Sequence, residues 1–251
     1  MIEMLALAST LLLRAQAAAD SAPLVLDLNL PAFRLELHEP GLPIERFSVA
    51  IGSPRYPTPR GDYSVTVLEL NPEWNPPESP WAVGSVPMVP GPANPMGRAK
   101  MMFKPLYFIH GTPDTASIGQ AVSHGCVRLL NADALKLAAR VLRAGVPHLD
   151  ELQRAQLLES TSTSDIRLTH VVRAQVRYEL LEIMAGQVVA YPDVYRLRSA
   201  TTDSVAQALI ERAVAPAEAV PGIARKLLDS ARAGPVRAPI DAVISRSREG
   251  P

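Results

Sequence analysis

The N-terminal part of the chain alternates apolar and polar residues with a period of two. Leu26, Leu28 and Leu30 alternate with Asp27 and Asn29. Successive side chains of a strand point to opposite faces, so this alternation predicts a half-buried strand. The runs that show it cover residues 24–30, 33–37, 47–51 and 63–67. Turn-forming proline and glycine separate the second run from the third, and the third from the fourth, so we expect a β-meander.

Residues 71–98 break this pattern with many prolines. Proline has no backbone N–H and fixes φ, so the segment can form neither a long helix nor a central strand. A loop of this length in a compact domain is commonly a lid or a binding loop. Trp74 and Trp81 then either close over a ligand or pack as ordinary core, and the sequence does not separate these alternatives.

Strand character returns at residues 101–109, which we expect to form one strand with His110-Gly111 at its end. A Gly- and Ser-bearing loop follows at residues 112–122 and leads to Cys126. Asn131 has the character of a helix N-cap. Apolar residues then repeat at helical spacing until Gly145 and Pro147. The pattern predicts a helix directly after a loop that carries Cys126.

We place the main domain at residues 21–150 and interpret the remainder of the chain as additions to it. The pattern of residues 151–200 predicts a β-hairpin subdomain, in which strands at 172–178 and 188–191 are joined by a turn at Ala185-Gly186. Residues 201–251 predict a helical extension, with helices at 204–214 and 223–231 and a mobile tail from Gly234.

Twenty-five basic residues balance twenty-five acidic residues, so no strong positive field attracts nucleic acid, which we exclude as a partner. The only cysteine is Cys126, so an internal disulfide is impossible.

The first 20 residues have an apolar run at 4–13 followed by small residues that fit an export-peptidase site. Glu3 and Arg14 fit such a signal peptide poorly, and an N-terminal cytosolic helix is the alternative. The run is about ten residues long, too short to span a bilayer, so we expect no membrane span after cleavage.

Cys126 lies in a polar, glycine-containing stretch, as a nucleophile presented on a turn would. A thiolate needs a base, and either His110 or His124 is available. We favour His110, because His124 is two residues from the cysteine and points away from it in an extended segment. N–H groups at Gly125 and Cys126 would stabilise an oxyanion, and Arg128 would bind a substrate carboxylate.

Two other interpretations remain open. His110, His124 and Cys126 together could ligate zinc, but their spacing matches no common zinc motif, so we predict neither a metal nor another cofactor. A buried structural cysteine is the default for a single cysteine.

His110-Gly111, twelve further residues and then Ser123-His124-Gly125-Cys126-Val127-Arg128 resemble the motif of the L,D-transpeptidases, the YkuD-domain family of bacterial cell-wall enzymes. Segments containing Thr58 and Asn94 resemble two further motifs of the family, and the likeness covers about residues 24–150. The resemblance implies a mainly β, β-sandwich catalytic domain with few short helices. It also implies that Cys126 is the nucleophile, that His110 is the general base and that the Gly111 carbonyl orients His110. We expect Ser123, His124, Arg128, Thr58 and Asn94 to bind the substrate.

The reaction that the resemblance implies begins with attack of the cysteine on a peptidoglycan tetrapeptide stem. D-Ala leaves, and an amine then accepts the acyl group. Arginine at position 128, two residues after the cysteine, resembles the motif of a Gram-negative subgroup of the family. This subgroup includes enzymes that attach an outer-membrane lipoprotein to peptidoglycan. We therefore expect peptidoglycan stem peptides as partners, an outer-membrane lipoprotein as one acceptor and a periplasmic location. The alternatives are an L,D-carboxypeptidase or amidase that hydrolyses the same acyl-enzyme, and an inactive wall-binding protein.

Overall fold

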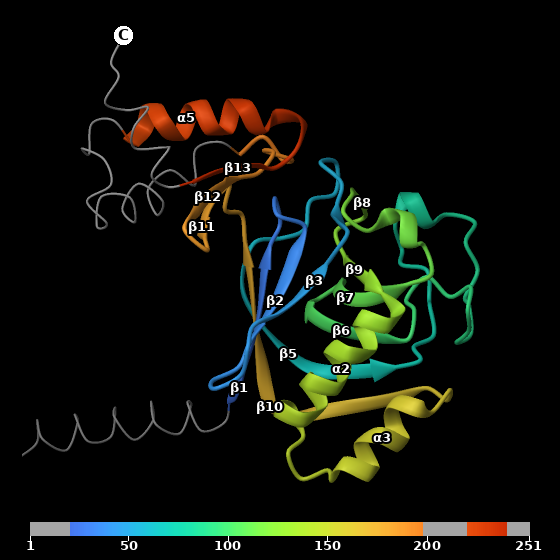
Figure 1. The fold of residues 1–251 in the computed structure, drawn as a ribbon. Helices are drawn as coiled ribbons and strands as arrows, with labels where there is room; N and C mark the ends of the chain where they lie inside the picture. Colours follow the sequence, from blue (N-terminus) through green and yellow to red (C-terminus); the bar gives the residue numbers. More distant parts are fainter. Residues whose placement is uncertain (1–20, 198–219, 240–251) are drawn as a thin grey trace, which may run out of the picture. The chain divides into compact units, whose positions relative to one another are not determined.

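The computed structural model describes residues 21–197 and 220–239 (Figure 1). The predicted signal peptide at 1–20 and the predicted helix at 204–214 lie outside these residues. The described chain forms two compact units, one of residues 21–28 and 35–176, the other of residues 29–34, 177–197 and 220–239. The first unit holds the residues singled out above.

The first unit is built on an eight-stranded sheet with the strand order β3-β2-β1-β10-β5-β6-β7-β9. A second sheet has two short parallel strands, β4 and β8. The strands are β1 (Ser21–Asn29), β2 (Arg34–His38), β3 (Glu45–Ser48), β4 (Ile51–Gly52), β5 (Gly61–Leu70), β6 (Ala99–Lys104), β7 (Tyr107–Thr112), β8 (Ala121–Ser123), β9 (Val127–Leu130) and β10 (Ser164–Arg177). The expected mainly β fold, with sandwich-like sheets and few helices, is confirmed.

The strand β10 lies between β1 and β5, and β5 is not next to β3 as the expected meander would place it. Its residues 172–176 pair antiparallel with residues 61–65 of β5, so this segment is not the first arm of a hairpin as predicted. The predicted alternation is confirmed, because Val172, Ala174 and Val176 are all buried. A period of two fixes which face a strand buries but not which strand it pairs with, and the partner here lies about a hundred residues upstream.

Two strands replace the single strand that we expected at residues 101–109. β6 and β7 pair antiparallel around a turn at Pro105-Leu106, and Leu106 takes a positive φ of 70°. Proline interrupts a strand because it cannot donate to the ladder. The consequence is that His110 lies inside a central strand, directly across from β6.

The helix α2 (Asn131–Gly145) packs its apolar stripe on β6, β7 and β9 (Figure 1). Its extent agrees with the prediction, but Asn131 is not an N-cap. The helix begins after Leu130 with no side-chain cap, and Asn131 Oδ1 accepts a hydrogen bond from the Arg98 N–H at 3.1 Å. The side chain thus fixes the end of the 71–98 loop.

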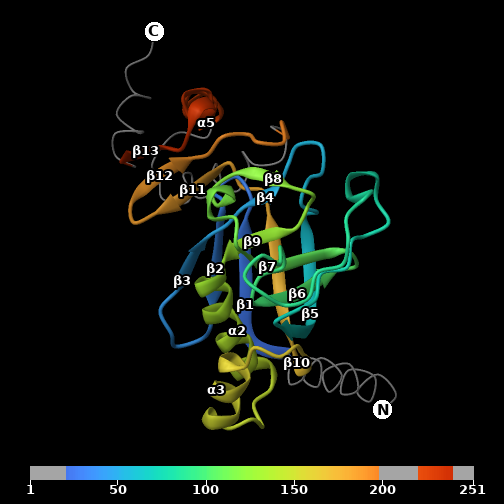
Figure 2. The same cartoon turned by 90° about the vertical axis from the view of Figure 1, so that its right-hand side faces the viewer.

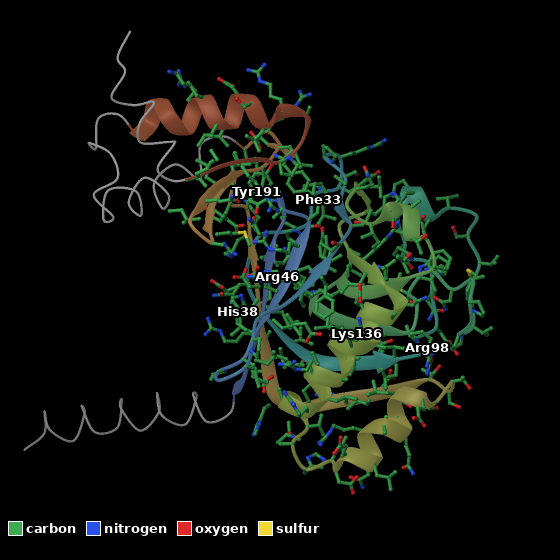
Figure 3. The ribbon with its side chains drawn as sticks, viewed as in Figure 1. Phe33, His38, Arg46, Arg98, Lys136 and Tyr191 are labelled. Atoms are coloured by element: carbon green, nitrogen blue, oxygen red, sulfur yellow. The ribbon has the colours of Figure 1, made fainter. Side chains whose placement is uncertain are left out.

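The segment 71–98 is a long structured loop, as predicted, with a short turn of 3₁₀ helix, η1 (Pro80–Ala82), and an isolated β-bridge between Trp74 and Met88. Figure 2 shows it reaching out beside β5 and β6. Arg98, labelled in Figure 3, anchors the end of the loop by donating from Nε to Asn71 Oδ1 at 2.6 Å. Its guanidinium also donates to the backbone carbonyls of Leu158 and Ser160. The remaining helices of this unit are η2 (Thr115–Ser117) and α3 (Glu151–Glu159).

The second unit has a three-stranded sheet, β11 (Leu181–Met184), β12 (Gln187–Ala190) and β13 (Val236–Pro239), with the helices α5 (Val220–Ser230) and η4 (Ala231–Ala233). The turn at Ala185-Gly186 and a helix near residues 223–231 are confirmed. The expected mobile tail from Gly234 is wrong for residues 236–239, which pair with β12. Among the described helices of both units, none is long and apolar enough to cross a membrane.

Candidate active site

The parallel pairing of β7 with β9 places the candidate residues on one face of the large sheet. Ile109 pairs with Val127, and His110 pairs with Arg128. Ile109 and Val127 are buried. Side chains alternate between the two faces, so His110 and Arg128 point to the face opposite Ile109, and Cys126, two residues before Arg128, does the same. The register alone therefore makes His110 and Cys126 diagonal neighbours.

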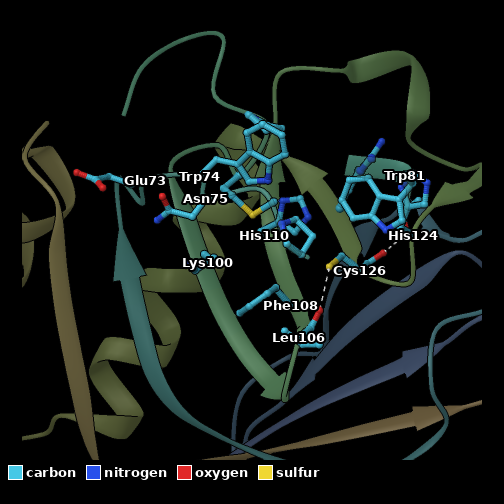
Figure 4. A pocket seen from close by; sticks show the side chains of 15 residues that line it. Glu73, Trp74, Asn75, Trp81, Lys100, Leu106, Phe108, His110, His124 and Cys126 are labelled. Carbon is cyan, nitrogen blue, oxygen red and sulfur yellow. Dashed lines mark hydrogen bonds between the residues drawn. The ribbon is translucent and has the colours of Figure 1, made fainter. Parts of the chain in front are cut away.

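These three side chains line a cavity of about 360 Å³, shown in Figure 4. Its walls come from the 71–98 loop, from β6 and β7 and from the segment before β9. Besides His110, Cys126 and Arg128 they include Trp74, Trp81, Met96, Lys100, Phe108 and His124. Both tryptophans thus line the cavity, which favours the binding-loop interpretation over ordinary core.

His110 is almost completely buried, at 2% exposure, and its Nδ1 lies 2.6 Å from the Gly111 carbonyl oxygen. A carbonyl only accepts, so Nδ1 carries the hydrogen and Nε2 holds the free lone pair. Burial lowers the pKa of His110 from 6.5 to about 4; the Gly111 carbonyl opposes this shift, and the positive charges of Arg128 and Lys100 add to it. His110 is therefore a neutral imidazole near neutral pH, able to accept a proton at Nε2.

Burial raises the pKa of the Cys126 thiol above its ordinary value of 9.0. The Phe108 N–H and the charges of Arg128 and Lys100 oppose this shift by stabilising the thiolate. The Sγ atom lies 4.0 Å from the Leu106 carbonyl oxygen (Figure 4). Near neutral pH the thiol keeps its proton, so nucleophilic attack needs a base.

The turn that presents Cys126 depends on Gly125, whose φ is 105°. A Cβ at this position would lie 2.6 Å from a ring carbon of Tyr107, so only glycine fits. The Gly125 N–H donates to Ser123 Oγ at 3.1 Å, and the buried Ser123 hydroxyl donates to the Cys126 carbonyl at 2.6 Å. Ser123, which also borders the cavity, thus binds through its hydroxyl to the backbone of the two residues that follow His124.

His124 points into an aromatic stack. Its ring is parallel to the Trp81 indole, with centroids 4.0 Å apart and an interplanar angle of 9°, and Tyr56 packs at 4.9 Å. Burial and the nearby Arg128 and Arg55 lower the pKa of His124, which favours the neutral ring. The sequence offered no signal for this stack, because its members come from three separate loops.

Arg128 is partly buried, and its guanidinium lies 3.7 Å from an Asp114 carboxylate oxygen. Its side chain lines the cavity, and Arg128 pairs with His110 across the β7–β9 ladder. The position agrees with a role in binding an anionic group.

Thr58 and Asn94 are both buried and do not belong to the residues that line the cavity. Thr58 Oγ1 accepts from the Gly52 N–H at 2.9 Å. Asn94 donates to the backbone carbonyls of Pro72, Met88 and Val89 and accepts from the Met96 N–H. The structure thus places these two side chains inside the loops that frame the cavity.

Sequence reasoning missed Lys100, which lies across the ladder from His110 and lines the same cavity. The signal was present in the alternation of β6, since Lys100 is flanked by the buried Ala99 and Met101. The described residues hold no group of three or more His, Cys, Asp and Glu side chains arranged to bind a metal ion.

Residues 23–164 match the model of the L,D-transpeptidase catalytic domain, the YkuD family. The chain belongs to the L,D-transpeptidase family. The match covers more than half of the chain and contains every residue of the site. It confirms the resemblance inferred from the motifs.

Similar proteins include one from Bacillus licheniformis named as an L,D-transpeptidase, YkuD, which is 31% identical over 123 residues, 49% of this chain and 62% of that protein. YbiS of Escherichia coli is 46% identical over 66 residues, 26% of this chain and 22% of that protein, and it is also named as an L,D-transpeptidase. The chain thus spans less than two thirds of the length of these relatives.

A solved structure of an L,D-transpeptidase from Mycobacterium smegmatis matches 62% of this chain and 59% of its own, with 14% sequence identity and a TM-score of 0.40. An L,D-transpeptidase from Xylanimonas cellulosilytica covers 62% and 61%, with 18% identity and a TM-score of 0.34.

Proposed function

We propose that this protein is a peptidoglycan L,D-transpeptidase in which Cys126 is the nucleophile and His110 the general base. The observation that carries the proposal is the hydrogen bond from His110 Nδ1 to the Gly111 carbonyl at 2.6 Å. It fixes the tautomer and leaves Nε2 as the acceptor on the sheet face that also bears Cys126. We place the catalytic function in residues 21–150.

The first step forms a thioester and releases D-Ala. His110 Nε2 takes the thiol proton while Sγ attacks the carbonyl carbon of the third residue of the tetrapeptide stem, which is bonded to the nitrogen of D-Ala. The tetrahedral intermediate collapses, the C–N bond breaks, and the proton passes from His110 to the leaving amine of D-Ala. Burial raises the pKa of the Cys126 thiol, so this proton transfer accompanies the attack.

The second step transfers the acyl group to an amine. The imidazole, neutral again, accepts a proton from the incoming amine as nitrogen attacks the thioester, and the thiolate leaves with that proton restored to it. A second stem peptide or a lysine of an outer-membrane lipoprotein is the proposed acceptor. With these acceptors we also propose a periplasmic location.

The developing oxyanion needs donors close to Cys126. We propose the backbone N–H groups of Gly125 and Cys126 for this role. In the resting site the Gly125 N–H donates to Ser123 Oγ, so its use by the oxyanion replaces that bond. Ser123 keeps its own bond to the Cys126 carbonyl, which holds the turn in place during the exchange.

The remaining site residues divide between substrate binding and support. We propose that Arg128 binds a stem-peptide carboxylate, and that Ser123 and His124 shape the wall beside it. Thr58 and Asn94 affect the substrate through the loops that they hold, since their polar groups bond to backbone atoms.

The test is incubation of the purified protein with disaccharide tetrapeptide, with products read by mass spectrometry. Cross-linked dimer supports transpeptidation, and tripeptide alone indicates hydrolysis of the same acyl-enzyme. The Cys126→Ser variant is the negative control, and His148→Ala, which removes an exposed histidine outside the cavity, is the matched control. Absence of both products and of any acyl adduct on Cys126 would refute the proposal.

A further inference from the structure

A row of charged residues crosses the sheet through the candidate base. Glu69 of β5 pairs with Lys100 of β6, Lys100 pairs with His110 of β7, and His110 pairs with Arg128 of β9. Paired residues on adjacent strands project to the same face, so all four lie side by side on the face that bears Cys126. His110 therefore has a cation on each side.

The Lys100 side chain is firmly placed. Its Nζ lies 2.6 Å from a Glu69 carboxylate oxygen and 5.0 Å from the centroid of the Phe108 ring. Only 14% of the side chain is exposed, so solvent screens its charge less than that of a surface lysine. The cation is thus held in one position beside the cavity.

We propose that Lys100 is a positioning residue of this site, a fixed positive charge beside His110 that keeps the imidazole an unprotonated base and favours the thiolate of Cys126. The proposal rests on the proposed cysteine chemistry. Arg128 supplies a second charge, but it lies near Asp114 and is placed to bind substrate. Lys100 is the cation whose own partner, Glu69, lies on the side away from His110.

Lys100 has a larger electrostatic effect on His110 than its ion-pair partner Glu69, because Lys100 lies closer to His110. Adjacent strands are about 4.8 Å apart, so Lys100 is one strand from His110 and Glu69 is two strands away. Burial has the largest effect on the pKa of both His110 and Cys126, and Lys100 lowers both values together with Arg128, which has the larger effect of the two cations. Besides the Cys126 thiol, the charged and titratable groups around His110 are Glu69, Glu73, Lys100, Asp114, His124 and Arg128.

The test compares the full-length Lys100→Met, Lys100→Arg and Glu69→Gln variants with the wild type. The matched control is Lys136→Met, which removes a lysine of α2 that is also paired with a carboxylate, Asp133 (Lys136 is labelled in Figure 3). Two titrations are measured: the rate of Cys126 alkylation by iodoacetamide against pH, and the His110 ring signals in NMR spectra against pH. Neither requires a cell-wall substrate, so transpeptidation can fail while this proposal holds.

We expect Lys100→Met to raise the midpoints of both titrations, by about half to one pH unit, because removal of a positive charge favours the protonated imidazole and disfavours the thiolate. Lys100→Arg should leave both midpoints near their wild-type values, Glu69→Gln should lower both slightly because it removes the negative charge that offsets Lys100, and Lys136→Met should give no shift. Folding of each variant is checked by circular dichroism.

Unchanged midpoints in a folded Lys100→Met protein would overturn the proposal. A raised KM for the tetrapeptide with unchanged midpoints would instead make Lys100 a substrate-binding residue, and this too contradicts it. Should Lys100→Met fail to fold, the uncharged but polar Lys100→Gln variant is measured in its place, and unchanged midpoints in that variant count against the role of Lys100.

Discussion

The indole of Trp81 lies parallel to the imidazole of His124, with ring centroids 4.0 Å apart. Trp81 belongs to the 71–98 loop, and His124 is two residues from Cys126, so one contact joins the loop to the turn that presents the thiol. Both rings line the cavity. The aromatic stack therefore couples the wall of the cavity to the candidate nucleophile.

We predict that Trp81→Ala raises the KM for the tetrapeptide about fivefold and changes kcat less, because an aromatic pair contributes about 1 kcal/mol. Trp81→Phe should retain part of the effect, since a phenyl ring can still stack on His124. Steady-state kinetics with the disaccharide tetrapeptide measure both constants. Identical kinetics for the alanine variant and the wild type would show that the stack is not used in binding.

The two histidines near Cys126 should differ strongly in their effect on turnover. We expect His110→Ala to reduce kcat by roughly 10²- to 10⁴-fold, as loss of a general base does, and Cys126→Ser to abolish nearly all turnover. His124→Ala should lose less, because His124 contributes packing to the aromatic stack. Comparable losses for His110→Ala and His124→Ala would mean that the base has been misassigned.

Gly125→Ala should disable the site although it adds only one methyl group. The φ of 105° is strained for alanine, and the new Cβ would meet the Tyr107 ring at 2.6 Å. Displacement of the turn by about 1 Å is expected to reduce activity about 100-fold. Gly41→Ala is the matched control, with a φ of 77° and no atom within 4 Å of the added Cβ. Equal activity of the two variants would show that the turn tolerates a side chain.

Acid should destabilise the folded protein through His110. An unfolded histidine titrates near pH 6.5, whereas the folded pKa of His110 is about 4. Between these values the unfolded chain binds a proton that the folded chain excludes, so the free energy of unfolding falls as pH drops from 6.5 to 4, by up to about 3 kcal/mol. Above pH 6.5 the effect is absent.

Urea unfolding at pH 7 and at pH 4.5 measures this change, and the His110→Gln variant isolates it. The variant lacks the titrating group at this position, so its free energy of unfolding should fall less between the two pH values. If the wild type and the variant show the same pH dependence, His110 is not the buried neutral group that the structure indicates.

Much of the site followed from local sequence. The spacing of His110, Gly111 and Cys126 led to the family, and the match over residues 23–164 confirms it. The roles of these residues stay predictions. The extents of α2, the 71–98 loop and the turn at Ala185-Gly186 were also predicted, because each depends on residues close together in the chain.

Other features depended on which distant segments pair. Strand periodicity does not identify a partner, so the insertion of β10 between β1 and β5 was missed. Asn131 has the residue type of an N-cap, but its side chain bonds to the distant Arg98 N–H instead.

The sequence by itself determined the candidate reactive residues of this protein, because the proposed thiol, base and glycine turn are recognisable from residue type and spacing. Only the tertiary structure decided what surrounds them. Strand register placed Lys100 beside His110, and loop packing placed Trp81 on His124. Each contact joins two segments that are distant in the sequence. Their packing depends on burial and hydrogen bonding throughout the domain, and local residue patterns do not identify which segments pack together.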